Sequence, residues 1–178
     1  MLVTSQTKDH CFSIAHSKLI RSSPNHRWSP PLDGWIKINM DASFVDGNAF
    51  TAAVIRNRNG SILLASTAIH RCSDPLAAEC IAILDACLII HNLSIKNVYF
   101  ESDCSNAINL INSNSASGFW TAHPIVEKIK KTWNGWPSWI FKYSPRSTNR
   151  AAHELAKWTA NSLSVGLISL DAIPISVF

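Results

Sequence analysis

A short stretch around residue 40 constrains the fold more than any other part of the sequence. From Ile36 to Asp41, apolar residues alternate strictly with polar ones. This period of two predicts a strand with Asp41 at its end. Two more β-rich runs follow at 50–56 and 61–69, and they are joined by a segment containing Asn59-Gly60, a pair that tolerates the positive φ of a tight hairpin. The three runs therefore predict an antiparallel three-stranded meander.

The rest of the pattern predicts helices interleaved with strands. Asp74-Pro75 supplies an N-cap and a first-turn proline for a helix that ends near Asn92. Asn149 is expected to cap the last helix. The other expected elements are strands at 97–103 and 139–143 and helices at 105–112 and about 123–133. A helix between two strands allows them to run parallel, so the order β-β-β-α-β-α-α-β-α predicts an α/β domain with a mixed sheet.

Length and composition favour one folded domain. The 178 residues are 47% hydrophobic and only 16% charged, which is enough apolar material for a core and too little charge for a disordered chain. We expect a linker or tail at 1–34, the domain at 35–163 and a docked C-terminal tail at 164–178. No apolar stretch reaches the roughly 20 residues of a bilayer span, so no membrane association is expected.

Charge and cysteine content indicate which kind of partner and which cellular compartment to expect. The net charge of +4 mildly favours a polyanionic partner. Five cysteines without a CxxC pair, and no secretory signal, predict a reducing intracellular compartment, with nucleus or cytoplasm favoured. The Ser-rich, acid-poor N-terminus weakly suggests an organellar transit peptide, although a linker is the favoured interpretation. The His and Cys residues lack the paired spacing of zinc ligands.

Three carboxylates stand where the predicted fold could gather them. Asp41 and Asp103 end strands, and Glu79 lies on the intervening helix. Strands that end at one edge of a sheet bring their terminal side chains together, and clustered carboxylates repel unless a cation lies between them. Mg²⁺ or Mn²⁺ suits such oxygen ligands, although most acidic residues are solvated surface charges. Glu101 shares the face of Asp103 and is either a helper or an edge charge.

Four motifs, between about residues 28 and 162, resemble one family. The stretch from Trp28-Ser29-Pro30-Pro31 to Asp41-Ala42-Ser43 is similar to the opening of ribonuclease H-like domains abundant in plant genomes, which are relatives of the ribonuclease H module of retroelements and reverse transcriptases. The other three motifs occur in the family's order: Pro75-Leu76-Ala77-Ala78-Glu79, Glu101-Ser102-Asp103-Cys104, and Asn149-Arg150-Ala151-Ala152-His153-Glu154-Leu155-Ala156-Lys157.

The resemblance implies a ribonuclease H-like fold with a five-stranded mixed sheet, two divalent ions, and hydrolysis of the RNA strand of RNA–DNA hybrids. Asp41, Glu79 and Asp103 match the family's metal-binding acids. The fourth acid does not carry over, because that position holds His153, and Glu154 lies about 100° farther round the helix. His153 is either a weak ligand that favours Mn²⁺ over Mg²⁺ or a partly exposed neutral histidine. The segment 144–147 also lacks the loop histidine of many cellular ribonucleases H.

Basic and aromatic residues add a candidate nucleic-acid surface. Lys128 and Lys131, with Arg146 and Arg150, could follow a phosphate backbone or form a solvated face. The seven Trp residues could stack on bases, but core packing is the favoured interpretation. We therefore expect either a monomeric metal-dependent hybrid nuclease or a degenerate retroelement-derived domain that binds nucleic acid or a protein without turnover. A recombinase or exonuclease on the same fold fits the last motif less well.

Overall fold

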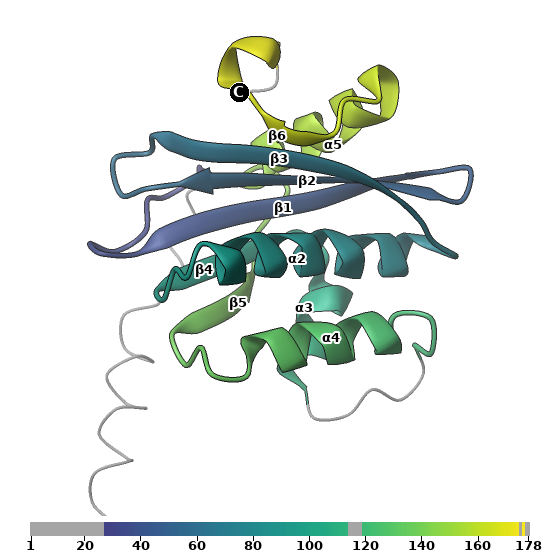
Figure 1. Ribbon diagram of the computed structural model, residues 1–178, viewed down its shortest axis with the longest axis horizontal. Coiled ribbons are helices and arrows are strands. Elements are labelled where there is room, and N and C mark those ends of the chain that lie inside the picture. The colour runs from purple at the N-terminus through teal and green to yellow at the C-terminus, as the bar shows by residue number, and fades with distance from the viewer. Residues whose placement is uncertain (1–26, 114–118, 175, 177–178) are drawn as a thin grey trace, which may run out of the picture.

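The computed structural model describes residues 27–113, 119–174 and 176 and shows a six-stranded mixed sheet with helices on both faces (Figure 1). The strand order is β5-β4-β1-β2-β3-β6. The strands are β1 (Ile36–Val45), β2 (Asn48–Arg56), β3 (Ile62–Arg71), β4 (Val98–Ser102), β5 (Trp139–Tyr143) and β6 (Gly166–Ile168). The helices are α2 (Pro75–Asn92), α3 (Ser105–Asn112), α4 (His123–Trp133) and α5 (Arg150–Ser162), followed by the short 3-10 helix η1 (Leu170–Ala172).

The predicted meander is present, but its first strand is longer than expected. β1 pairs antiparallel with β2 from Lys37 to Val45, and the chain reverses at Asp46 and Gly47, which have φ values of 48° and 72°. The expectation that the strand ends at Asp41 is therefore wrong. The hairpin partner extends the ladder beyond the alternating stretch, and Asp41 lies in mid-strand.

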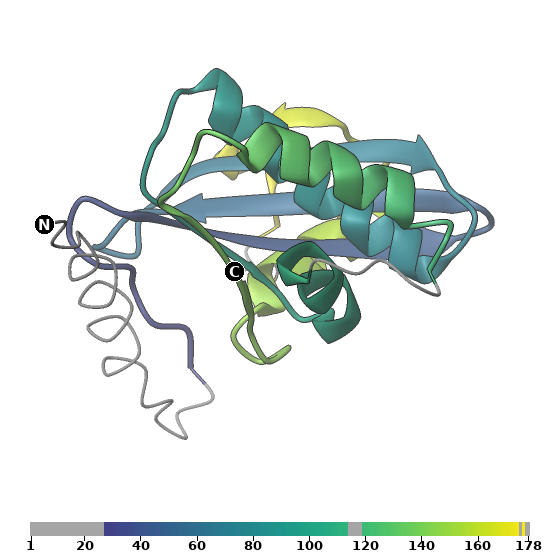
Figure 2. The same ribbon diagram turned by 90° about the horizontal axis from the view of Figure 1, so that it is seen from below.

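The helices divide between the two faces of the sheet. Asp74 caps α2 as predicted, since its carboxylate accepts a hydrogen bond of 2.9 Å from the backbone N–H of Ala77. The larger core lies between the sheet and α2, α3 and α4, whereas a smaller core lies under α5 (Figures 1 and 2). Although α2 is long and apolar enough to cross a membrane, it packs against β1, β2 and α4. Cys80 and Cys87 are buried in the larger core, as expected for packing residues.

A sixth strand corrects the expected count of five. β6 pairs antiparallel with β3, and the Thr67 hydroxyl donates to the Ser164 carbonyl at 2.8 Å. Ile173, which follows η1, is 5% exposed and packs in the smaller core. A strand of three residues that includes a glycine is too short to show a period of two, so part of the predicted C-terminal tail is sheet. Of the predicted N-terminal linker, residues 1–26 lie outside the described residues.

Candidate active site

Three carboxylates from separate elements converge at one place. Asp41 lies on β1, Glu79 in the second turn of α2, and Asp103 immediately after β4. One oxygen from each lies within 4.8 Å of the other two. The parallel register ends at the pair Met40 and Ser102, directly before Asp41 and Asp103, and α2 packs against β1 beside them. The convergence expected from the sequence is thus present, although Asp41 reaches it from the middle of its strand.

Three ionised carboxylates in this cluster would be unfavourable, because the groups are buried and repel one another. Asp41 is 2% exposed, and burial together with the carboxylates of Glu79 and Asp103 raises its pKa to about 9. Burial, followed by the charge of Asp103, raises the pKa of Glu79 to about 8. Without a cation, the cluster therefore holds protons that ordinary carboxyl groups release near pH 4.

The donor set fits a hard divalent ion. Oε2 of Glu79 is buried and has no hydrogen-bond partner among the described residues, so a strong acceptor faces the cluster unsatisfied. Carboxylate oxygens that converge in this way are the ligands preferred by Mg²⁺ and Mn²⁺. The cluster opens into a hollow of about 360 Å³. Its lining comprises Pro75, Leu76, Glu79, Asp103, Cys104, Asn106 and Arg146.

His153 and Arg146 close the cluster on the α5 side. The Nδ1 atom of His153 lies 2.7 Å from Oδ2 of Asp41, and the Arg146 guanidinium lies 2.6 Å from Nε2 of the same ring. The same guanidinium nitrogen also lies 2.9 Å from Nδ1. A guanidinium can only donate, and its shorter contact is with Nε2, so the tautomer in which Nε2 accepts and Nδ1–H donates to Asp41 fits these distances. Burial, then the positive charges of Arg146 and Lys157, lowers the pKa of His153, which keeps the ring neutral. Arg146 also lies 3.8 Å from Oδ2 of Asp103.

Asn149 is a site residue that sequence reasoning missed. It occupies the predicted N-cap position of α5, but its side chain makes no capping hydrogen bond. Instead, the fully buried amide donates to the Met40 carbonyl at 2.8 Å and lies 3.4 Å from Oδ1 of Asp103. The prediction that the Asn149 side chain caps the helix was wrong, because the local sequence does not reveal acceptors that lie far away along the chain. The only available signal was its place in the motif that contains His153.

Glu101 lies one layer below the acidic cluster and is already paired. Its carboxylate forms an ion pair of 2.8 Å with Lys37 and accepts a hydrogen bond from Asn39 at 3.3 Å. The indole of Trp28 donates to Asn39 at 2.9 Å and covers this layer. Glu101 is therefore neither the exposed edge charge nor an available helper, because its two oxygens are bound to neighbours.

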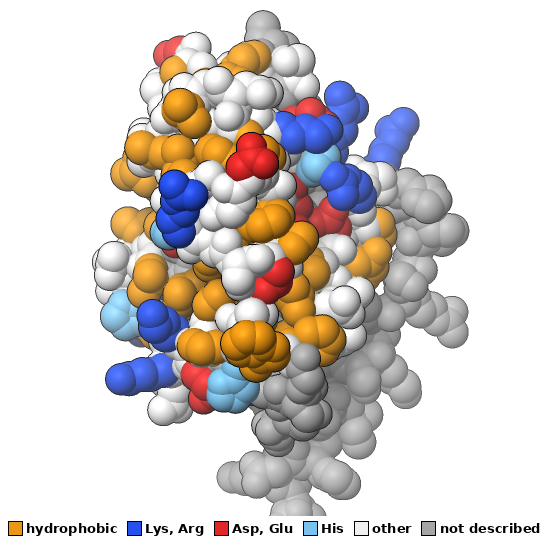
Figure 3. Space-filling model, turned by 90° about the vertical axis from the view of Figure 1, so that its right-hand side faces the viewer, with side chains coloured by type: hydrophobic (Ala, Val, Ile, Leu, Met, Phe, Trp, Pro, Cys, Tyr) orange, Lys and Arg blue, Asp and Glu red, His pale blue; other side chains and the backbone are white. Residues whose placement is uncertain are grey.

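The structure separates the four candidate nucleic-acid-binding cations. Arg146 lines the acidic hollow, and Arg150 is exposed at the start of α5. On the face shown in Figure 3, Lys and Arg side chains gather around a small group of acidic and histidine side chains. Lys128 and Lys131 are exposed on α4 instead.

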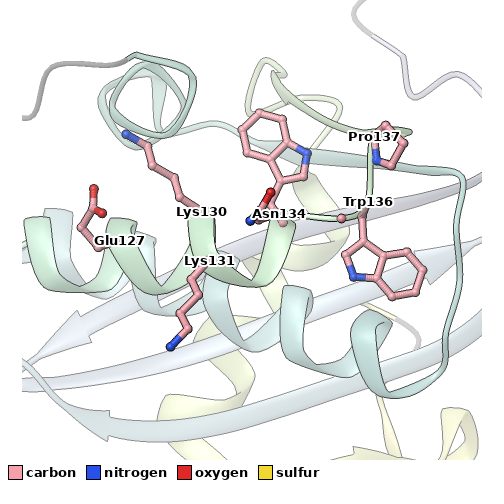
Figure 4. Close-up of a pocket in the computed structure, with 8 residues that line it drawn as sticks. Glu127, Lys130, Lys131, Asn134, Trp136 and Pro137 are labelled. Atoms are coloured by element: carbon pink, nitrogen blue, oxygen red, sulfur yellow. The ribbon is translucent and has the colours of Figure 1, made fainter.

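A second hollow, of about 720 Å³, lies at the end of α4 and includes Lys131 (Figure 4). Its lysines point to opposite sides in Figure 4, and the ring of Trp136 stacks on Trp139 with centroids 5.3 Å apart. Trp136 also contacts His91, which is twelve residues after Glu79 on α2, or about 18 Å along the helix. This hollow is therefore remote from the acidic cluster, and its Trp136 ring serves packing.

Comparisons with known proteins agree with this architecture. The family model described as reverse transcriptase-like matches residues 39–159. A search of curated proteins finds no match. The ribonuclease H1 of the halophilic archaeon Halobacterium salinarum is 15% identical, with a TM-score of 0.66 over 72% of this chain and 98% of its own.

Two further solved structures include nucleic acid. LC11-RNase H1 in complex with an RNA/DNA hybrid is 21% identical, with a TM-score of 0.64 over 72% of this chain and 99% of its own. The foamy viral protease-reverse transcriptase, also with an RNA/DNA hybrid, is 14% identical, with a TM-score of 0.58 over 81% of this chain and 23% of its own. At these identities the likeness establishes a ribonuclease H fold.

Proposed function

Since the chain belongs to the reverse transcriptase-like family, we propose that it binds RNA–DNA hybrids and cleaves their RNA strand internally in a divalent-metal-dependent hydrolysis. The observation that carries the proposal is the convergence of Asp41, Glu79 and Asp103, with a buried oxygen on Glu79 that has no hydrogen-bond partner within the described ranges. Solved structures of LC11-RNase H1 and of the foamy viral enzyme with RNA/DNA hybrids support the choice of substrate.

Different residues around this cluster would bind the metal and the nucleic acid. Asp41, Glu79 and Asp103 would hold Mg²⁺ or Mn²⁺, which when bound supplies Lewis-acid activation of water and stabilises charge on the phosphate oxygens. Arg146 lines the same hollow, and its side chain is 65% exposed, so it can reach a backbone phosphate while contacting His153. Arg150, four residues later, would extend the positive surface along the strand.

His153 would weaken this activity. A neutral imidazole at the position of a fourth acid adds no negative charge, and its Nε2 is in contact with the Arg146 guanidinium. It would become a ligand only if the metal displaced that contact, which Mn²⁺ would do more readily than Mg²⁺ because Mn²⁺ accepts nitrogen ligands better. We therefore propose low activity that favours Mn²⁺. The proposal includes a monomeric chain in a reducing compartment, either nucleus or cytoplasm, and the second part is supported by the four cysteines that are free in the described part of the chain.

A second candidate is binding of nucleic acid without turnover. It is favoured by one observation, namely that Asp41 and Asp103 already have protein partners in His153, Asn149 and Arg146. A site whose acceptors are satisfied by protein donors has less need of a metal. The two candidates differ in hydrolysis and share the hybrid-binding surface.

The deciding experiment is cleavage of a labelled RNA–DNA hybrid, compared with duplex DNA and duplex RNA, in Mg²⁺ and in Mn²⁺. We expect cleavage only of the hybrid's RNA strand, faster in Mn²⁺, and abolished by Asp41→Asn while salt-sensitive hybrid binding persists. Unchanged cleavage by the variant would show that the activity comes from elsewhere. Binding without cleavage in either metal would favour the second candidate.

A further inference from the structure

The protein donors around the acidic cluster limit how many ions it can hold. Three carboxylates provide six oxygens, but Oδ2 of Asp41 is bound by His153 at 2.7 Å. Both oxygens of Asp103 face donors, with the Asn149 amide at 3.4 Å and the Arg146 guanidinium at 3.8 Å. Glu79 contributes the buried oxygen that has no partner among the described residues. A hydrogen-bonded carboxylate oxygen keeps a second lone pair, so these donors do not exclude metal ligation, but they compete with a second ion, and no fourth carboxylate among the residues around this cluster offsets that competition.

Arg146 adds a fixed positive charge to the same space. Its guanidinium is held by the 2.6 Å contact with His153 and lines the hollow with Glu79 and Asp103. A guanidinium stays protonated at all ordinary pH values. A second divalent ion beside it would meet repulsion from both the first ion and the guanidinium, without a fourth carboxylate to offset that repulsion.

We propose that this site binds a single divalent ion through Asp41, Glu79 and Asp103, and that the Arg146 guanidinium serves as its permanent second cation. The inference rests on the proposed metal site, but it does not require that the protein cleaves RNA. Three carboxylate charges are balanced by one divalent ion and one guanidinium, whereas a second divalent ion would leave a net positive charge in the hollow.

The test counts ions bound to the full chain without nucleic acid. Mn²⁺ is titrated calorimetrically, and bound ions are counted independently by the loss of the free Mn²⁺ electron paramagnetic resonance signal. We expect one Mn²⁺ per wild-type chain. Two ions per wild-type chain would overturn the proposal directly, whatever the variants do.

Two variants examine the role of Arg146. Arg146→Gln removes the charge and should tighten the binding of the first ion roughly tenfold, the effect of a unit charge a few ångströms from a divalent ion in a partly exposed site. Arg146→Gln combined with His153→Asp should bind two ions, because the second position then gains a carboxylate and loses the competing cation. A folded double variant that still binds one ion would refute the role given to Arg146, as would unchanged affinity in Arg146→Gln.

A matched control removes one positive charge far from the hollow. Lys96 is exposed and precedes β4, whereas Asp103 follows this strand, so about 20 Å of extended chain separates the two. Lys96→Gln should therefore leave the count and the affinity of Mn²⁺ unchanged, and an equal tightening would mean that net charge alone explains the result. Because no substrate is present, failure of the cleavage assay and failure of this inference are separate outcomes.

Discussion

Asp41→Asn is expected to stabilise the metal-free protein, even though it removes a carboxylate from the proposed metal site. The Asp41 carboxyl is almost completely buried, and its pKa is raised from 3.8 to about 9. A carboxyl whose pKa is higher in the folded than in the unfolded chain stabilises the fold at low pH. That stability is lost as the pH rises from about 4 through about 9.

The size of the effect follows from the charge that the substitution removes. One pKa unit corresponds to about 1.4 kcal/mol, and part of the shift at Asp41 comes from Glu79, whose own pKa is raised to about 8 by burial and by the charge of Asp103. We therefore assign about 2–3 kcal/mol to the single charge at pH 8. Asparagine has the same shape, and its amide oxygen can still accept the hydrogen bond from His153.

The assay is urea denaturation followed by Trp fluorescence, at pH 5 and pH 8, in EDTA and in Mn²⁺. In EDTA at pH 8 the variant should have the larger free energy of unfolding, and in Mn²⁺ the order should reverse, because the ion stabilises only the wild-type site. Glu127→Gln, at an exposed position on α4, is the matched control and should show neither effect. A variant less stable than wild type in EDTA at pH 8 would refute the argument.

Three further predictions concern contacts outside the acidic cluster. The hydrogen bond to Asp85, at 2.8 Å, raises the pKa of His70, so its stabilising contribution should be complete below about pH 6 and fade as the pH rises through the raised pKa. Urea denaturation of His70→Gln between pH 5 and 8 should show a flatter dependence. Lys37→Met should cost about 3–5 kcal/mol by leaving the buried Glu101 unpaired, and adding Glu101→Gln should restore most of that loss in the same assay. Trp28→Ala should cost about 1–2 kcal/mol by thermal denaturation, because the half-buried ring and its hydrogen bond to the sheet are lost.

Local signals in the sequence predicted much of the fold. The Asn59-Gly60 pair marked the hairpin between β2 and β3, and Asp74-Pro75 marked the start of α2 with its capping carboxylate. Apolar spacing gave α3, α4 and β5 with their observed bounds. Each of these signals depends on residues close together in the chain, which is why one sequence sufficed to place them.

Contacts between distant residues account for what the sequence did not reveal. β6 exists because β3 offers an unpaired edge, and β1 continues past Asp41 because β2 extends beside it. The side chain of Asn149 turns from its helix toward Met40, more than a hundred residues earlier. Contacts of this kind depend on the assembled sheet and leave no periodic pattern in the local sequence. The convergence of the carboxylates could therefore be predicted from the sequence, whereas the donors that contact them could not.

His153, which stands where the family motif has a fourth acid, acts together with Asn149 and Arg146, which precede it in the chain. Asn149 and His153 are four residues apart, so they share one face of α5, and Arg146 lies one turn earlier in the connecting loop. All three present N–H donors, and the contacts run from His153 to Asp41 and from Asn149 and Arg146 to Asp103. A carboxylate at position 153 would instead face Asp41 and be drawn to the guanidinium beside it. Restoring the acid alone would therefore create a new ion pair with Arg146 as readily as a metal ligand, which is why the charge at both positions determines how many ions this site can hold.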